Sequence, residues 1–131
     1  MTSKVKEQEQ RTILLVEDDD LSLKSLSLVI SSLGHVVLAA RSAEEALELV
    51  DKKQINLLMT DFHLPGINGV DLVTELRDEG VCVPVVLISG YLNEAVQKKA
   101  KDAQVDVMIS KPPDLLKLEN VLTRLLGQSL S

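Results

Sequence analysis

The chain has 131 residues, 45% of them hydrophobic and only 2% aromatic, which predicts a single domain with an aliphatic core. Its formal charge of −6 argues against direct nucleic-acid binding, and no apolar run approaches the ~20 residues that a membrane-spanning helix needs. The polar N-terminus has no secretory signal and the single cysteine, Cys82, cannot form an intrachain disulfide, so we expect a cytoplasmic protein without membrane insertion.

We expect residues 1–11 to form a flexible leader, residues 12–127 the folded domain and residues 128–131 a short tail. Within the domain, five short aliphatic runs are apolar on successive residues. This pattern is typical of strands that are buried on both faces. The five predicted strands are at residues 12–16, 36–40, 55–60, 84–88 and 105–109.

Apolar residues with helical spacing follow each of these runs. The first helical stretch ends at Gly34, and Ser42 with Glu45 predicts a capping box at the start of the second. The remaining three stretches cover residues 70–77, 92–103 and 113–125. In the last of them we expect one buried face made of the leucines at positions 115, 118, 122 and 125.

Strands that alternate with helices require right-handed crossovers, which produce a parallel sheet with helices on both faces. We therefore predict an α/β fold: a single doubly wound domain with five parallel strands in the order 2-1-3-4-5 and five flanking helices. The ligand site of such a sheet lies at the carboxyl ends of the strands, near the switch between strands 1 and 3.

The residues expected at these strand ends are acidic or polar. The first run leads into four consecutive acids at 17–20, the third ends at Asp61, the fourth ends at Ser89, and Lys111 follows the fifth. Helix capping explains one acid, such as Asp19, but it explains neither four consecutive acids nor a fifth, Asp61, at the end of the adjacent strand. Because two carboxylates about 4 Å apart repel by roughly 1–4 kcal/mol, the cluster indicates a bound cation. Oxygen ligands favour Mg²⁺ or a similar ion over zinc.

The same groups are suited to phosphoryl transfer. A carboxylate between a metal ion and an ammonium can act as the nucleophile, while Lys111 stabilises charge on the transferred oxygens and the Ser89 hydroxyl donates a hydrogen bond to one of them. Alone, Lys111 is equally consistent with a surface lysine and Ser89 with a helix cap. Their joint position at the strand ends favours the phosphoryl site.

Four segments resemble the signatures of the response-regulator receiver domain of two-component signalling, which has a flavodoxin-like fold: ILLVEDDD, TDFHLPGINGVDL, VVLISGY and ISKPP. The resemblance spans roughly residues 11–126. It implies that Asp61 is the phosphoacceptor. It also implies that Mg²⁺, or Mn²⁺, is held by Glu17, Asp18, Asp61 and the main-chain carbonyl of His63.

The resemblance further implies that Ser89 is the switch hydroxyl and Lys111 the family's lysine, followed by Pro112 with a cis peptide bond. One position departs from the family: Met108 stands where a Tyr or Phe is usual, three residues before the lysine. Because Met is flexible and apolar, we expect it to define the two states of the switch less sharply than an aromatic ring.

The function implied is a phosphorylation-driven switch. A phosphohistidine on a sensor histidine kinase or a histidine phosphotransfer protein gives its phosphoryl group to Asp61. The new charge then shifts the surface made of the fourth helix, fifth strand and fifth helix, which a downstream protein target binds. Self-catalysed phosphotransfer and slow autodephosphorylation replace the turnover of a conventional enzyme.

Two other functions are compatible with parts of this pattern. A phosphorylation-independent interaction module with the same fold is mildly favoured by Met108. A phosphohydrolase of the haloacid dehalogenase type needs a second Asp two residues after its nucleophile, where this chain has His63. Because only four residues follow Gly127, we expect no output domain here, so the chain is either a stand-alone regulator or the receiver part of a larger hybrid kinase or regulator.

Overall fold

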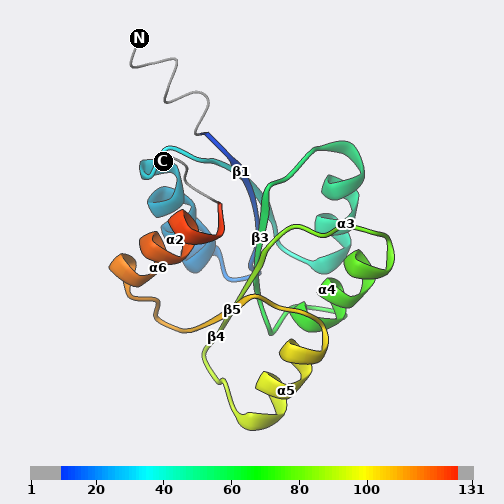
Figure 1. Cartoon of the computed structure of the whole chain (residues 1–131). Helices are drawn as coiled ribbons and strands as arrows, with labels where there is room; N and C mark the ends of the chain where they lie inside the picture. Colours follow the sequence, from blue (N-terminus) through cyan, green and yellow to red (C-terminus); the bar gives the residue numbers. More distant parts are fainter. Residues whose placement is uncertain (1–9, 127–131) are drawn as a thin grey trace.

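The computed structural model describes residues 10–126, in which five strands alternate with five helices. The strands form one parallel sheet in the order β2-β1-β3-β4-β5, which confirms the predicted doubly wound α/β fold. Helices α2 and α6 cover one face of the sheet, and α3, α4 and α5 cover the other (Figure 1). The elements in chain order are β1 (Thr12–Val16), α2 (Asp20–Ser32), β2 (Val36–Ala40), α3 (Ala43–Lys52), β3 (Leu57–Asp61), α4 (Gly69–Asp78), β4 (Val85–Ser89), α5 (Glu94–Asp102), β5 (Val107–Ser110) and α6 (Leu115–Leu125).

The domain boundaries predicted from the sequence are only partly covered by these residues. Residues 1–9 of the expected leader lie outside the described residues, as do residue 127 of the expected domain and the expected tail at 128–131. Within residues 10–126, no helix combines the length and the apolar character needed to span a membrane.

Three strands begin and end later than predicted, at 57–61, 85–89 and 107–110 instead of 55–60, 84–88 and 105–109. Pro84 has no N–H for the sheet, and β4 begins at Val85, whose N–H donates to Asp106 Oδ2 at 2.8 Å. At the start of β4, the main-chain N–H is therefore paired with a side-chain carboxylate and not with the main chain of a neighbouring strand. As a consequence of the shift, Asp61 and Ser89 are the last residues of β3 and β4 and are held by the sheet itself.

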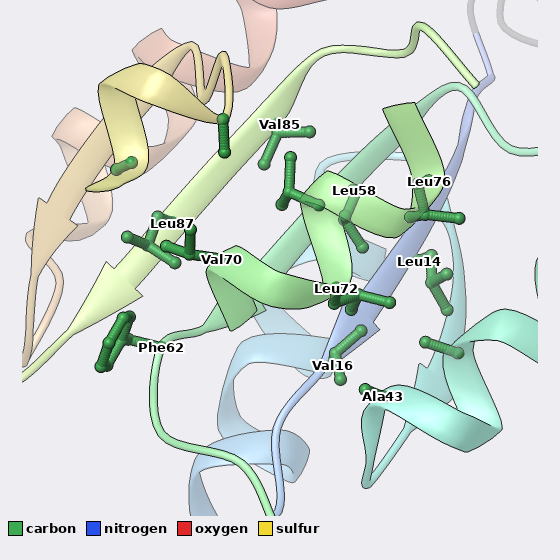
Figure 2. Packing of buried hydrophobic residues seen from close by; sticks show 14 of the residues in the cluster. Leu14, Val16, Ala43, Leu58, Phe62, Val70, Leu72, Leu76, Val85 and Leu87 are labelled. Carbon is green, nitrogen blue, oxygen red and sulfur yellow. The ribbon is translucent and has the colours of Figure 1, made fainter. Parts of the chain in front are cut away.

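Two aliphatic clusters on opposite faces of the sheet form the core. Successive strand residues point to opposite faces, so Leu14 and Leu58 pack under α3, α4 and α5, whereas Ile13 and Leu57 pack under α2 and α6. Figure 2 shows part of the first cluster, where Leu72 of α4 lies over the strands. Full burial of each such side chain contributes about 1.5–3 kcal/mol, which makes the sheet a firm support for the residues at its edge.

The capping box predicted at the start of α3 is confirmed, whereas the predicted burial of one leucine in α6 is wrong. The Ser42 hydroxyl accepts from the Glu45 N–H at 3.1 Å, and the Glu45 carboxylate accepts from the preceding Arg41 N–H at 2.9 Å. Leu115, expected on the buried face of α6, is 57% exposed. It is the first helical residue after the N-cap Asp114, so it lies at the rim of the sheet, beyond the cluster that buries Leu118, Val121 and Leu122.

Arg77, in the last turn of α4, joins the end of that helix to two other segments. Its guanidinium donates to the main-chain carbonyls of Val81 at 3.2 Å, Val83 at 2.7 Å and Gln104 at 2.9 Å. These carbonyls belong to the segments that lead into β4 and β5. Three carbonyls therefore depend on one planar donor group.

We expect Arg77→Lys to lower the free energy of unfolding by about 1–3 kcal/mol, because a single ammonium cannot reproduce the planar fork and leaves carbonyls unpaired. Urea denaturation followed by circular dichroism measures the change. The control is Lys98→Gln, which removes an exposed cation 3.8 Å from Asp102 and should alter the free energy by no more than ~0.5 kcal/mol. An Arg77→Lys variant as stable as the wild type would contradict this role.

Candidate functional site

The sheet positions the residues at its carboxyl edge by continuing its hydrogen bonds past the strand ends. The Glu17 N–H donates to the carbonyl of the last residue of β2 at 2.9 Å, and the Phe62 N–H donates to a β4 carbonyl at 3.0 Å. The Lys111 N–H donates to the Ser89 carbonyl, also at 2.9 Å. The main chain on either side of the acidic cluster is therefore fixed by strand pairing.

The Lys111 ammonium connects two of the predicted acids. Its Nζ lies 2.7 Å from Glu17 Oε1 and 2.8 Å from Asp61 Oδ2. Both carboxylates are buried, with exposed fractions of 2% for Glu17 and 7% for Asp61. Their other oxygens accept main-chain N–H groups, from Asp19 at 3.1 Å and from His63 at 3.3 Å. Each carboxylate thus has one ammonium contact and one main-chain contact.

Burial and charge act against each other at these groups. Burial raises the pKa of the Glu17 carboxyl, hydrogen bonds from Lys111 and Asp19 oppose this, and the neighbouring charge of Asp61 adds to it. Burial on its own would lower the pKa of the Lys111 ammonium, but the hydrogen bonds to Asp61 and Glu17, together with their charges, raise it. Lys111 therefore stays charged and serves as the counterion of both carboxylates.

A third carboxylate leaves the site with excess negative charge. Oxygens of Glu17, Asp18 and Asp61 lie within 4.8 Å of one another, and Asp18 is exposed to solvent. If all three are ionised, three negative charges face the single positive charge of Lys111. The donor atoms are all hard carboxylate oxygens, which suit Mg²⁺ or Mn²⁺ better than a softer metal. The residues therefore fit a divalent cation.

Ser89 lies at the neighbouring strand end with its hydroxyl engaged locally. The side chain is fully buried, and Oγ accepts from the Tyr91 N–H at 3.1 Å and donates to the Tyr91 carbonyl at 3.3 Å. Within the described residues, the Ser89 hydroxyl forms its hydrogen bonds with Tyr91, and Lys111 Nζ forms its own with Glu17 and Asp61. The structure thus places Ser89 on the same edge but does not join it to Asp61.

The other predicted positions differ in what they contribute. His63 is exposed, and its main-chain N–H is the group that contacts Asp61. The Lys111–Pro112 peptide bond is cis, as the resemblance implied. Met108 pairs with Leu87 across β4 and β5 and packs, partly buried, against the core cluster beneath α3, α4 and α5. It is therefore a packing residue in this structure, away from the ion pairs.

Sequence reasoning missed two residues that hold the main chain of Asp61. The buried Thr60 hydroxyl donates to the Asp61 carbonyl at 2.9 Å. A side chain at Gly69 would collide with the same carbonyl. In the turn at residues 64–69, Gly66 supplies backbone freedom with a positive φ of 81°, whereas Gly69 has no positive φ. Gly69 is needed for space, and no local sequence signal separates the two roles.

Comparisons with known proteins agree with this geometry. A family model described as the response regulator receiver domain matches residues 13–123. The two-component response regulator PhoP of Pseudomonas aeruginosa is 35% identical over 117 residues, which cover 89% of this chain and 52% of that protein. The transcriptional regulatory protein CrdR of Helicobacter pylori is 30% identical, covering 88% of this chain and 54% of its own length. The chain thus spans about half the length of these two relatives. The polar-differentiation response regulator DivK of Brucella ovis is 23% identical, and the match covers 91% of this chain and 98% of that protein.

Solved structures show the same fold. A putative response regulator from Chloroflexus aurantiacus superposes with a TM-score of 0.85 at 27% identity, covering 91% of this chain and 99% of that one. The receiver domain of a sensor histidine kinase from Pseudomonas aeruginosa, which holds a magnesium ion in its active-site cleft, superposes with a TM-score of 0.83 at 22% identity and the same coverage. The family model, the sequence relatives and the fold point to the same family. The chain belongs to the response regulator receiver domains of two-component systems.

Proposed function

We propose that this chain is a phosphoacceptor that takes a phosphoryl group from the phosphohistidine of a sensor histidine kinase or a histidine phosphotransfer protein onto Asp61. The observation that carries the proposal is the position of Asp61 at the end of β3. One of its oxygens is 2.8 Å from Lys111 Nζ, and its carboxylate lies within 4.8 Å of the Glu17 and Asp18 oxygens. A carboxylate in such surroundings is held in place for attack on an incoming phosphoryl group.

In the proposed transfer, a carboxylate oxygen of Asp61 forms the new bond to phosphorus while the bond from phosphorus to the donor imidazole nitrogen breaks. Lys111 keeps its ammonium beside the reacting carboxylate and stabilises the charge on the transferred oxygens. A bound Mg²⁺ or Mn²⁺, held by Glu17, Asp18, Asp61 and the His63 carbonyl, would neutralise part of the phosphoryl charge. The Ser89 hydroxyl exchanges the Tyr91 carbonyl for a phosphoryl oxygen as its acceptor.

Inward movement of the Ser89 and Lys111 side chains towards the phosphoryl group is how the site would affect its output surface. Ser89 is the last residue of β4, and Lys111 follows β5. Movement of either side chain would therefore shift the surface made of α5, β5 and α6, where a downstream protein target would bind. Met108 lies in β5 within this surface region and would repack without a rotating aromatic ring. A water molecule in line with the acyl phosphate would slowly hydrolyse it, which resets the switch.

The free thiol of Cys82 is consistent with a protein that acts in the reducing cytoplasm.

Divalent-cation binding should depend on Asp18. We expect Asp18→Asn to raise the Kd for Mg²⁺ by about tenfold or more, because it removes a ligand charge while leaving both Lys111 contacts intact; tenfold corresponds to ~1.4 kcal/mol. Isothermal titration calorimetry measures the Kd. The matched control is Asp20→Asn, the neighbouring acid that pairs with Arg41 instead, which should change the Kd far less. Equal effects of the two substitutions would contradict the ligand assignment.

Phosphorylation should depend on Asp61. Incubation with acetyl phosphate and Mg²⁺ should add one phosphoryl group to the wild type, measured by intact mass, and none to Asp61→Asn, because the amide is not a nucleophile of comparable strength. Asp71→Asn, an exposed acid in α4, serves as the control and should be labelled like the wild type. A labelled Asp61→Asn variant would refute the assignment. A wild type that binds Mg²⁺ but takes no phosphoryl group would instead indicate the phosphorylation-independent module.

A further inference from the structure

We propose that Gly69 is a positioning residue for the phosphoacceptor: because it has no side chain, the main chain of Asp61 can occupy the position that aims its carboxylate at Lys111. This inference rests on the proposed function and adds to it a residue eight positions away from the reacting group. Gly69 does not touch the reacting atoms, so its effect passes through the Asp61 carbonyl.

The space at Gly69 is already filled by the backbone of Asp61. A Cβ atom built on Gly69 lies 2.2 Å from the Asp61 carbonyl oxygen, 3.1 Å from its carbonyl carbon and 3.1 Å from Thr60 Oγ1. Carbon and oxygen atoms that are not bonded make contact at about 3.3 Å or more. Any side chain at position 69 therefore requires a shift of main-chain atoms.

Neither side of this contact is free to yield. Asp61 is paired with Ile88 in the sheet, and the Phe62 N–H donates to the Ile88 carbonyl at 3.0 Å. The Gly69 N–H donates to the Phe62 carbonyl at 2.8 Å, which closes the loop between β3 and α4. α4 itself is anchored by Leu72, which is fully buried. A methyl group would thus push two fixed segments apart.

The carboxylate depends on that main-chain position through both oxygens. Asp61 Oδ2 is 2.8 Å from Lys111 Nζ, and Oδ1 accepts the His63 N–H at 3.3 Å from within the same loop. Small displacements of a positioned reacting group are costly, and about 1 Å can reduce a rate by roughly a hundredfold. A shift of the Asp61 backbone would therefore weaken both phosphoryl transfer and divalent-cation binding while the domain remains folded.

The test compares Gly69→Ala with two controls. Gly80→Ala adds the same methyl group beyond the end of α4, where nothing lies within 4 Å, and its positive φ of 88° makes the substitution mildly destabilising away from the site. Arg77→Lys destabilises the domain at the opposite edge of the sheet, so it separates loss of stability from loss of position. For each variant, acetyl phosphate labelling per folded molecule and the Kd for Mg²⁺ are measured, with the folded fraction taken from circular dichroism.

We expect the labelling rate of folded Gly69→Ala to fall tenfold or more and its Kd for Mg²⁺ to rise, while both controls stay within about twofold of the wild type. Unchanged labelling and Mg²⁺ affinity in folded Gly69→Ala would overturn the proposal and leave the phosphoacceptor role intact. If the wild type itself takes no label, the proposed function fails, and the Mg²⁺ affinities still decide the role of Gly69.

A second variant keeps the proposal testable if Gly69→Ala does not fold. Thr60→Val removes the 2.9 Å hydrogen bond to the Asp61 carbonyl with nearly the same side-chain shape, so it loosens the same carbonyl without adding an atom at position 69. A several-fold loss of labelling and Mg²⁺ affinity would support control of the site through this carbonyl. Wild-type values for both would overturn it.

Discussion

The ion pairs of Lys111 are the interaction on which the site depends. Two carboxylates that are almost completely buried, Glu17 and Asp61, share one ammonium at 2.7 and 2.8 Å. A buried carboxylate without a partner costs several kcal/mol or takes up a proton, and a protonated Asp61 would be a poor nucleophile. Lys111 follows β5, two strands from β3, so the ammonium reaches across the end of β4. The long lysine stem makes this contact possible while part of the side chain stays in solvent.

The architecture keeps that contact in register. The parallel sheet brings the ends of β1, β3 and β5 to one edge, and hydrogen bonds beyond the strand ends fix Glu17, Phe62 and Lys111. The loop after β3 closes tightly on the Asp61 carbonyl, with Gly69 on one side and the Thr60 hydroxyl on the other. The site is therefore stiff where the phosphoryl group would be bonded. It is adjustable where a hydroxyl can change partners, at Ser89 and Tyr91.

The sequence predicted the strand order and the convergence of Glu17, Asp18, Asp61 and Lys111, because apolar runs alternating with helices leave few topologies and the carboxyl ends of parallel strands share one edge. It did not predict features set by contacts in space. The starts of β4 and β5 depend on Pro84 and on the Asp106 side chain, and the exposure of Leu115 depends on where the sheet ends beneath α6. The collision that excludes a side chain at Gly69 depends on how the loop folds back, which spacing alone does not reveal.

The most direct test of this account is a double-mutant cycle on the pair that holds the phosphoacceptor. Unfolding free energies are measured in Mg²⁺-free buffer for the wild type, Lys111→Met, Asp61→Asn and the double variant. Lys111→Met should be destabilising in both backgrounds because it strips the buried Glu17 of its counterion, and more so when Asp61 is also present, so the account predicts that the two substitutions couple by about 1–3 kcal/mol. Effects that add to within ~0.5 kcal/mol would show that the ammonium does not sustain the buried carboxylate, and would contradict the account.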